Sequence, residues 1–172
     1  SLEHLIIVTN ARNGWIHYEN ACASQPAQIA PHQLEPTRAD EMMLAYFTSG
    51  TTADPKLVPR DHSYAKAHEI TGRFWLDLND HDIHWTLSDT GWAKAAWGMV
   101  FGPWMAGAAI VLYDGDTRFD AVCHLKLIAK LHVSTFCAPP TVYRLFTQHD
   151  LTTYDLSSIR HSVSAGEPLN PE

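Results

Sequence analysis

The chain has 172 residues, of which 45% are hydrophobic and 18% charged, a composition typical of one globular domain with a buried core. Its net charge of −7 argues against a nucleic-acid partner, because phosphate backbones attract basic surfaces. Cys22, Cys123 and Cys137 show no C-x-x-C spacing, which argues against a disulfide framework or a zinc site and favours a reducing compartment.

In chain order, the first predicted element is a short interior strand over the apolar run 5–8. No charged leader precedes this run, so no secretory signal is expected. A short helix is predicted over 15–24, and the proline-rich stretch 25–38 is predicted to be a surface loop.

The next stretch has the clearest chemistry. The apolar run 42–47 predicts a buried strand, and it opens into a turn rich in hydroxyl groups that ends at Lys56. Hydroxyls and free backbone N–H groups can surround a phosphate, and a lysine adds a point charge. The stretch is not a Walker sequence, because Pro55 stands where that motif has glycine. The same residues are also compatible with an ordinary Ser/Thr/Gly turn.

From residue 61 onward, predicted helices and strands alternate. Helices are expected over 61–75, with Asp61 as a cap, and over 92–104, 119–131 and 139–146. Strands are expected over 83–87, 109–113, 133–137 and 159–164. This alternation predicts a single α/β unit over 1–172, with a mostly parallel sheet flanked by helices. Ligands of such sheets bind at the carboxyl ends of strands, where the 48–56 turn is expected to lie.

The sequence raises two further possibilities, a membrane span and a metal site, and argues against each. The segment 95–113 has no charged residue and is close to membrane-spanning length, but three glycines and a proline interrupt it. A buried helix followed by a strand is therefore favoured, and no membrane span is expected. His81 and His84 have neither the spacing nor the helix of paired metal ligands, so no metal site is expected there.

Several segments resemble the adenylate-forming enzymes, which include acyl-CoA synthetases, luciferases and peptide-synthetase adenylation domains. Residues 46–56, Tyr-Phe-Thr-Ser-Gly-Thr-Thr-x-x-Pro-Lys, are similar to the signature loop of that superfamily. Residues 88–97 and 136–144 resemble the acyl-CoA synthetases that act on short- and medium-chain acids, and residues 164–172 resemble the adenine-contact segment. The likeness covers about 42–172, while 2–41 is similar only in general character.

The resemblance implies roles for particular residues. The β- and γ-phosphates of ATP would be held by Thr48, Ser49, Gly50, Thr51, Thr52 and Lys56, and the adenine ring would lie against Gly166, Glu167 and Pro168. The acyl and CoA pocket would include Trp92, Trp97, Thr141 and Arg144, with Phe101 and Trp104 as further candidates. Core packing of the aromatic residues, a surface ion pair of Arg144 and a plain turn at 166–168 are the alternatives. The superfamily usually has glycine where this chain has Ala53, so the loop is expected to differ in shape.

The implied reaction has two steps that use ATP, Mg²⁺ and, as co-substrate, coenzyme A. A carboxylic acid is first activated as an acyl-adenylate, and CoA then displaces AMP to give a thioester. The superfamily's Tyr-Gly-x-Thr-Glu segment, ribose-binding aspartate and C-terminal catalytic lysine are not found in the sequence. We therefore expect a central fragment of the large N-terminal domain, inactive alone, with no catalytic residue and no metal ligand of its own.

Two alternatives remain open at this point. The parent protein could be an aryl-CoA ligase or a peptide-synthetase-type adenylation domain, or the chain could be a natively truncated, non-catalytic module that binds nucleotide or dimerises. A homodimer is possible in either case. The expected location is the cytoplasm, with the mitochondrial matrix as the alternative in a eukaryote.

Overall fold

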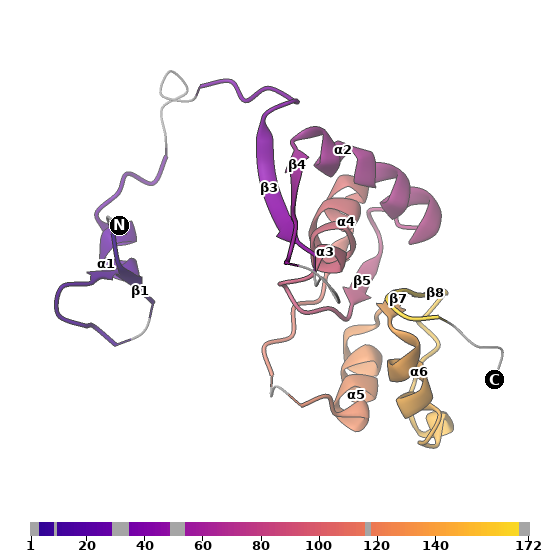
Figure 1. Cartoon of the computed structure of the whole chain (residues 1–172). Coiled ribbons are helices and arrows are strands. Elements are labelled where there is room, and N and C mark those ends of the chain that lie inside the picture. Colours follow the sequence, from indigo (N-terminus) through magenta and orange to yellow (C-terminus); the bar gives the residue numbers. More distant parts are fainter. Residues whose placement is uncertain (1–3, 9, 29–34, 49–53, 116–117, 169–172) are drawn as a thin grey trace. The chain divides into compact units, whose positions relative to one another are not determined.

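The structure is a computed structural model, and it describes residues 4–8, 10–28, 35–48, 54–115 and 118–168. It divides into two compact units, Ser1–Thr37 and Arg38–Glu172, and each is described by itself. Figure 1 gives the labels of the elements. That 1–172 forms a single α/β unit of a larger domain stays a prediction.

The first unit holds two short strands and one helix. Strand β1 (Ile6–Ile7) pairs in parallel with β2 (Ile16–His17), and helix α1 (Tyr18–Ala23) follows directly. The helix predicted over 15–24 is confirmed over 18–23, but its predicted start is wrong, because Ile16 and His17 form strand β2. The prediction of an interior strand over 5–8 is wrong in one respect, because Ile6 and Val8 are exposed. Two paired strands of only two residues each are too small to cover apolar side chains on either face.

The second unit begins with an antiparallel hairpin. Strand β3 (Met42–Phe47) pairs with β4 (Leu57–Asp61), with Ala45 opposite Pro59. The predicted limits of β3 are confirmed, but its predicted burial is wrong: the side chains of Met42 and Phe47 are 67% and 74% exposed. The turn 48–56 therefore joins two hairpin strands and does not follow a strand of the parallel sheet. Pro59 has no N–H to donate, which suits a strand of a two-stranded ribbon.

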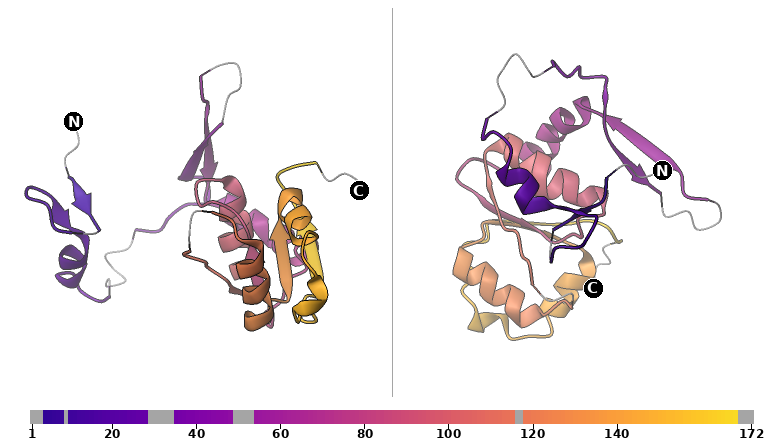
Figure 2. Two further views of the ribbon diagram at one scale, coloured as in Figure 1. Left: turned by 90° about the horizontal axis from the view of Figure 1, so that it is seen from below. Right: turned by 90° about the vertical axis from the view of Figure 1, so that its left-hand side faces the viewer.

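A four-stranded parallel sheet forms the centre of the second unit. Its order is β6 (Ala109–Ile110), β5 (Ile83–Thr86), β7 (Thr135–Ala138) and β8 (His161–Ser164). Trp85 lies opposite Phe136, and Cys137 lies opposite Val163. The predicted class, a parallel α/β sheet flanked by helices, is confirmed, and Figure 2 shows the sheet from two further sides.

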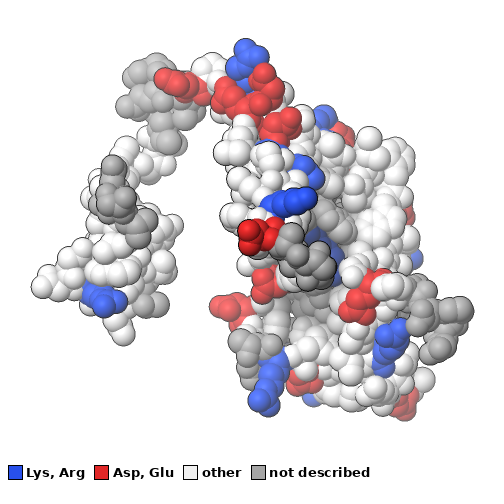
Figure 3. Space-filling model, in the orientation of Figure 1, with Lys and Arg blue, Asp and Glu red and all other residues white. Residues whose placement is uncertain are grey.

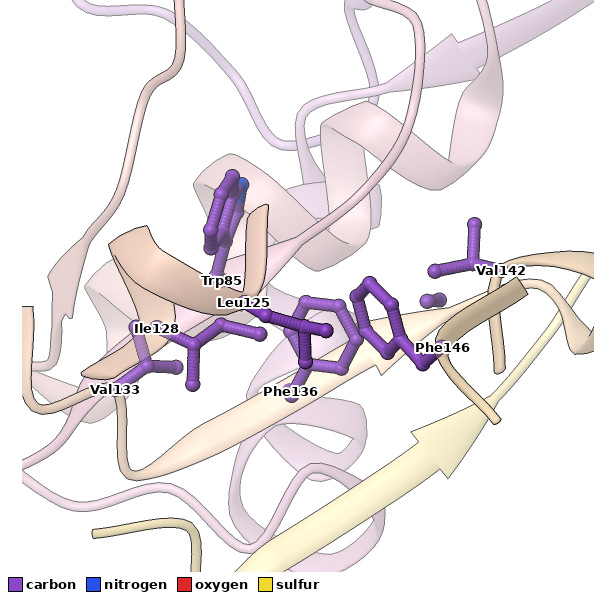
Figure 4. Packing of buried hydrophobic residues seen from close by; sticks show 8 residues of the cluster. Trp85, Leu125, Ile128, Val133, Phe136, Val142 and Phe146 are labelled. Atoms are coloured by element: carbon purple, nitrogen blue, oxygen red, sulfur yellow. The ribbon is translucent and has the colours of Figure 1, made fainter. Parts of the chain in front are cut away.

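Helices α5 (Ala121–Leu131) and α6 (Pro140–Phe146) cover one face of this sheet, and the short 3₁₀ helix η4 (Leu151–Thr153) follows them. The side chain of Asp120 caps α5 by accepting hydrogen bonds from the N–H groups of Val122 and Cys123. Figure 4 shows the apolar cluster between helices and sheet, which is made of Trp85, Leu125, Ile128, Val133, Phe136, Ala138, Val142 and Phe146.

Two helical rods contain π-helical turns and cover the opposite face. Helix α2 (Ser63–Ile70) continues into η2 (Thr71–Trp75), while α3 (Ala93–Ala95), η3 (Ala96–Phe101) and α4 (Gly102–Ala106) form the second rod. The rods meet at Gly72 and Gly102, so closely that a Cβ atom on Gly72 would lie 2.4 Å from the Gly102 carbonyl oxygen. The expected cap is wrong, because Asp61 ends β4, His62 holds the N-cap position of α2, and no side chain accepts a capping hydrogen bond there.

A charged cluster joins the amino ends of β5 and β8. Arg160 donates to both carboxylate oxygens of Asp82, at 3.0 and 2.6 Å, and to Asp77. Burial acts to raise the pKa of Asp82, but hydrogen bonds from Arg160, Ser134 and the Asn79 N–H outweigh it and hold that pKa below its usual value.

The described surface carries both signs of charge. On the face drawn in Figure 3, basic and acidic side chains are interspersed over the second unit, and the basic ones do not gather into one patch. Among the described residues, none of the helices has the length and apolar character needed to cross a bilayer.

Candidate functional site

The strand order places a topological switch point between β5 and β7. The chain leaves β5 for β6 on one side, and it leaves β7 for β8 on the other side. Connections that diverge in this way open a crevice at the carboxyl ends of the two strands, where open α/β sheets bind their ligands.

A cavity of about 430 Å³ lies at this position, within the size range of small-molecule sites. It is lined by residues that follow three strands of the sheet and by the start of the rod that contains α3. These residues are Leu87, Ser88, Asp89, Trp92, Ala93, Lys94, Pro139, Gly166 and Glu167. We call it the switch-point cavity.

A turn made by Asp89 presents Trp92 to the switch-point cavity. The Asp89 carboxylate accepts a hydrogen bond from the N–H of Gly91 at 2.7 Å, and its carbonyl accepts one from the N–H of Trp92 at 3.1 Å. Aspartate commonly closes turns in this way. The rod begins one residue later, so Trp92 is held at its entrance with its side chain 63% exposed.

The turn around Gly166, which the resemblance assigns to adenine contact, is held from two sides. The Lys94 ammonium donates to the Ala165 carbonyl at 3.3 Å, and the Thr141 hydroxyl donates to the Glu167 carboxylate at 2.5 Å. Gly166 lies between these anchors with a φ of 106°, a backbone conformation that side chains disfavour. The turn therefore exposes backbone, which a flat ring can approach closely.

The hairpin of β3 and β4, whose turn the resemblance assigns to phosphate binding, is called here the phosphate hairpin. It is closed by a reciprocal pair of hydrogen bonds at its base. The N–H of Thr48 donates to the Lys56 carbonyl, and the N–H of Lys56 donates to the Thr48 hydroxyl, both at 3.0 Å. A second cavity of about 460 Å³, the hairpin cavity, lies beside it and is lined by Phe47, Thr48, Pro55, Gly91 and Trp92. Ser49, Gly50, Thr51 and Thr52, together with Ala53, lie outside the described residues.

Trp92 also borders a third cavity, on the other side of the rod. This cavity, of about 280 Å³, is lined by Leu44, Tyr46, Thr90, Trp92, Ala95, Ala96, Met99, Val100 and Leu112. None of these side chains is a carboxylate, an ammonium or a guanidinium. We call it the apolar cavity, and Trp92 contributes to all three cavities.

A chain of buried hydrogen bonds connects strands β7 and β5 to η3, in the rod over 93–106. The Thr86 hydroxyl donates to the Gly98 carbonyl at 2.9 Å, so it must accept from Nε2 of His84 at 2.7 Å. Nδ1 of His84 then accepts from the Thr135 hydroxyl at 2.7 Å. Burial lowers the pKa of His84 to about 4, which keeps the ring neutral and the direction of the chain fixed.

The remaining predicted site residues lie away from the switch-point cavity. Trp97 packs against Trp75, with ring centroids 5.3 Å apart, and stacks on His68. Phe101 contacts Tyr64, and Trp104 is 62% exposed on α4. Thr141 does not line the switch-point cavity itself, but its hydroxyl donates a hydrogen bond to Glu167, which does. Arg144 on α6 and Pro168 are exposed, and neither lines one of the three cavities.

Sequence reasoning missed Lys94 and Pro139, which both line the switch-point cavity. A signal for Lys94 was present, because it is the last charged residue before the charge-free segment 95–113. Pro139 lies in the segment 136–144 that resembles the synthetases, but its residue-level prediction is only that it starts a helix. Its position beside Gly166 depends on the pairing of β7 with β8, which the sequence does not display.

Together, the parallel sheet, the cavity at its switch point and the glycine turn define a ligand-binding protein of the doubly wound α/β class. A family model described as "AMP-binding enzyme" matches residues 2–172. The chain therefore belongs to the AMP-binding enzyme family.

Curated relatives are acyl-coenzyme A synthetases. The mouse mitochondrial acyl-coenzyme A synthetase ACSM3 is 42% identical over 98% of this chain and 28% of its own length. The human mitochondrial ACSM4 is 39% identical over the same shares. The chain thus spans somewhat more than a quarter of the relatives that it matches.

Solved structures agree. The crystal structure of the anthranilate CoA ligase AuaEII in complex with anthranoyl-AMP matches with a TM-score of 0.83 and 28% identity, over 96% of this chain and 32% of that one. The Brucella canis acyl-CoA synthetase also matches with a TM-score of 0.83 and 28% identity, over 95% of this chain and 29% of that one.

Proposed function

We propose that this chain is the part of an acyl-CoA synthetase that holds ATP and the carboxylic acid during adenylation. The substrate would be a short- or medium-chain acid, and the products of the complete protein would be acyl-CoA, AMP and pyrophosphate. Family membership and the names of the curated relatives support the reaction type.

One observation carries the proposal for the site: Trp92 borders both the switch-point cavity and the hairpin cavity. A nucleotide whose base lies at Gly166 and Glu167 could extend past Trp92 toward Thr48 and Lys56. The α-phosphate would then lie between the two ends, beside Trp92, where the acid must also bind.

The chemistry of the two steps assigns the nucleophiles to the substrates. The carboxylate oxygen attacks the α-phosphorus, a new P–O bond forms, and the bond to pyrophosphate breaks. The CoA sulfur then attacks the acyl carbon, its proton is lost to solvent or base, and AMP leaves. The protein's contribution is to position the reactants and stabilise charge. Lys94 and the phosphate hairpin would do so here.

Mg²⁺ would accompany ATP in this reaction. Among the described residues, no group of three or more His, Cys, Asp or Glu side chains could hold a metal ion. We therefore assign none of the described residues to the metal, and no step depends on one here.

Calorimetric titration of Mg-ATP into the 172-residue chain tests the proposed nucleotide site. We expect binding that weakens at least several-fold in Lys56→Ala, because a charge-assisted contact is lost. Lys126→Ala, on the exposed side of α5, is the matched control and should bind as the wild type does. Equal affinity of the two variants would refute the role of Lys56.

An assay of the full-length gene product tests the reaction. Pyrophosphate release that depends on both ATP and a short or medium acid, followed by CoA-dependent thioester formation, is the expected result. Failure of every acid in such a panel would refute the proposed activity, whatever the calorimetry shows.

An aryl-CoA ligase is the second candidate. The anthranilate CoA ligase among the structural matches supports it, and so does Trp92, whose flat ring could stack on an aromatic acid. A preference for benzoate-type acids over aliphatic acids of equal carbon number would favour this candidate.

For the compartment of the protein, we use the names of the same curated relatives. The ACSM3 and ACSM4 names include the word mitochondrial, which supports the mitochondrial matrix over the cytoplasm. A fluorescent fusion of the full-length gene product would distinguish the two.

A further inference from the structure

Lys94 places a primary amine inside the candidate site. The structure describes every lysine of the sequence, and Lys94 alone among them lines one of the three cavities. Its amine donates to the Ala165 carbonyl at 3.3 Å and lies 3.7 Å from the point that a Cβ atom on Gly166 would occupy. The amine therefore lies in the switch-point cavity, at the turn where the proposed function places the adenine ring.

The amine of Lys94 forms no ion pair with any carboxylate that the structure describes. Asp89 and Glu167 line the same cavity, but the Asp89 carboxylate accepts a hydrogen bond from a backbone N–H and the Glu167 carboxylate accepts one from a hydroxyl. A carboxylate partner stabilises the protonated form of an amine, and an amine is a nucleophile only in its free form. The surroundings of Lys94 therefore leave its amine available for covalent chemistry.

The proposed reaction forms an acylating agent in this same cavity. The acyl-adenylate is a mixed anhydride, and its acyl carbon would lie beside Trp92, which lines the cavity together with Lys94. An electrophile and a nucleophile held in one cavity react faster than the same groups free in solution. The CoA thiol competes for the same carbon, so the amine can react mainly while CoA is scarce.

We propose that Lys94 is a self-modification site, whose amine takes the acyl group from the acyl-adenylate of its own molecule when CoA is absent. The inference rests on the proposed function and adds a form of regulation to that site. The free amine attacks the acyl carbon, a C–N bond forms, and the bond from that carbon to the phosphate oxygen breaks. AMP leaves with the electron pair of the broken bond, the proton of the amine goes to solvent, and the product is an amide.

Acylation of Lys94 should inactivate the site for two reasons. The amide carries no charge, so the cation beside the Ala165 carbonyl is lost. The acyl chain also stays in the switch-point cavity, where it occupies part of the volume of about 430 Å³ that the next substrate needs. Thioester formation should therefore fall about tenfold or more, and the loss should persist after the small molecules are removed, because an amide is covalent.

The experiment incubates the full-length gene product with Mg-ATP and the acid that releases pyrophosphate fastest, in the absence of CoA. Mass spectrometry of the intact protein and of its peptides then measures the acyl group at each lysine. Lys94 should carry about ten times more of it than the exposed Lys126 and Lys130, because only Lys94 shares a cavity with the donor. The rate should not depend on protein concentration, and CoA added at the start should suppress the modification.

A variant pair and a pH series add readouts that a purely structural lysine would not change. Lys94→Arg keeps a positive charge and a donor for Ala165, but a guanidinium does not lose its proton. Relative to its own starting activity, this variant should resist the inactivation. Lys126→Arg, on the exposed side of α5, is the matched control and should be inactivated as the wild type is. The acylation rate of the wild type should rise from pH 7 to pH 9, because only the free amine attacks.

Acylation that is concentrated at Lys94 and prevented by CoA supports the proposal. Pyrophosphate release without acylation of Lys94 overturns this inference and leaves the proposed function intact. Equal acylation of Lys94, Lys126 and Lys130 also overturns it, because acyl-adenylate released into solution modifies any exposed amine. Absence of pyrophosphate release with every acid overturns both proposals. The site is mapped on the wild type, so the result does not depend on the folding of Lys94→Arg.

Discussion

His84 is a buried histidine whose neutrality has structural consequences. Its ring joins β7 to β5 through Thr135 and Thr86, and Thr86 in turn joins β5 to the Gly98 carbonyl of η3. A second proton on the ring would make both nitrogens donors, and the Thr135 hydroxyl would have to turn away. The chain that supports the rod therefore depends on an unprotonated ring.

Acid should destabilise the second unit through His84. The folded pKa, about 4, lies below the unfolded value of 6.5, so the unfolded state binds more protons between these limits. The contribution of His84 to the free energy of unfolding is complete above pH 6.5. It decreases as the pH falls toward 4, by roughly 3 kcal/mol in total. Urea unfolding at several pH values measures this loss.

His84→Gln should flatten the pH dependence between 6.5 and 4, because the amide can donate and accept without titrating. His81→Gln is the control, since His81 is exposed in the turn before β5. An unchanged slope in His84→Gln would contradict the assignment.

Arg160 should matter for stability more than a surface arginine does. Asp82 is buried, and removing its partner would leave an uncompensated charge. We expect Arg160→Met to lower the free energy of unfolding by about 3 kcal/mol.

A double-mutant cycle separates the pair from other effects. In an Asp82→Asn background, Arg160→Met should cost clearly less than it does in the wild type. Equal costs in both backgrounds would show that the ion pair does not couple β5 to β8.

The elements of the second unit differ in how far the sequence predicts them. Helix α5 is evident from its apolar face, and β7 is evident from its β-branched and apolar run. Strand β4 is not evident, because its five residues include Pro59 and two charged side chains and its partner is the exposed β3. The sequence predicts β3 as part of the parallel sheet. This prediction is wrong, because β3 pairs with β4, a strand that the sequence does not reveal.

The close approach of the two rods is a feature that no local pattern contains. It occurs at Gly72 in η2 and at Gly102, the first residue of α4, and these glycines are thirty positions apart in the chain. In the candidate site, too, some residues can be identified from the sequence and others only from the fold. Resemblance indicates Trp92 and Gly166, whereas Lys94 and Pro139 join the site through the pairing of β5, β7 and β8.

Gly72→Ala should disrupt the contact between the two rods. The added methyl group would lie 2.4 Å from the Gly102 carbonyl oxygen, which is backbone and cannot turn aside. We expect a loss of about 1–3 kcal/mol in the free energy of unfolding, as for overpacked interiors. Gly91→Ala is the control, because its methyl would meet only the Asp89 side chain, at 3.1 Å. Wild-type stability of Gly72→Ala would show that the rods can separate without loss.

At the scale of the whole molecule, the buried ion pair and the candidate ligand site lie at opposite edges of one sheet. The Asp82–Arg160 pair lies at the amino ends of the strands, and the switch-point cavity lies at their carboxyl ends. Residues 89, 139 and 167 are far apart in sequence, and parallel pairing brings the strand ends before them to one edge. The sheet is therefore the element that assembles the site.

The 172-residue chain should self-associate through its helical face. Ile70, Phe74 and Trp104 are 67%, 80% and 62% exposed on helical segments that pack against each other. Exposed apolar groups of this size promote association. Light scattering should give a mass that rises with concentration, and Phe74→Ser with Trp104→Ser should reduce it toward that of a monomer. Leu112→Ser, on a separate segment, is the control, and a constant monomer mass for the wild type would refute the prediction.

Trp92 gives the protein an intrinsic optical reporter. Its indole ring borders three compartments of different polarity, so each kind of ligand should change its emission differently. An aliphatic chain that displaces water from the ring should shift the emission to shorter wavelength, and a nucleotide base stacked nearby should quench it. Difference spectra against Trp92→Phe would isolate this signal from the other five tryptophans. The order in which acid and nucleotide arrive could then be followed in real time, without a label.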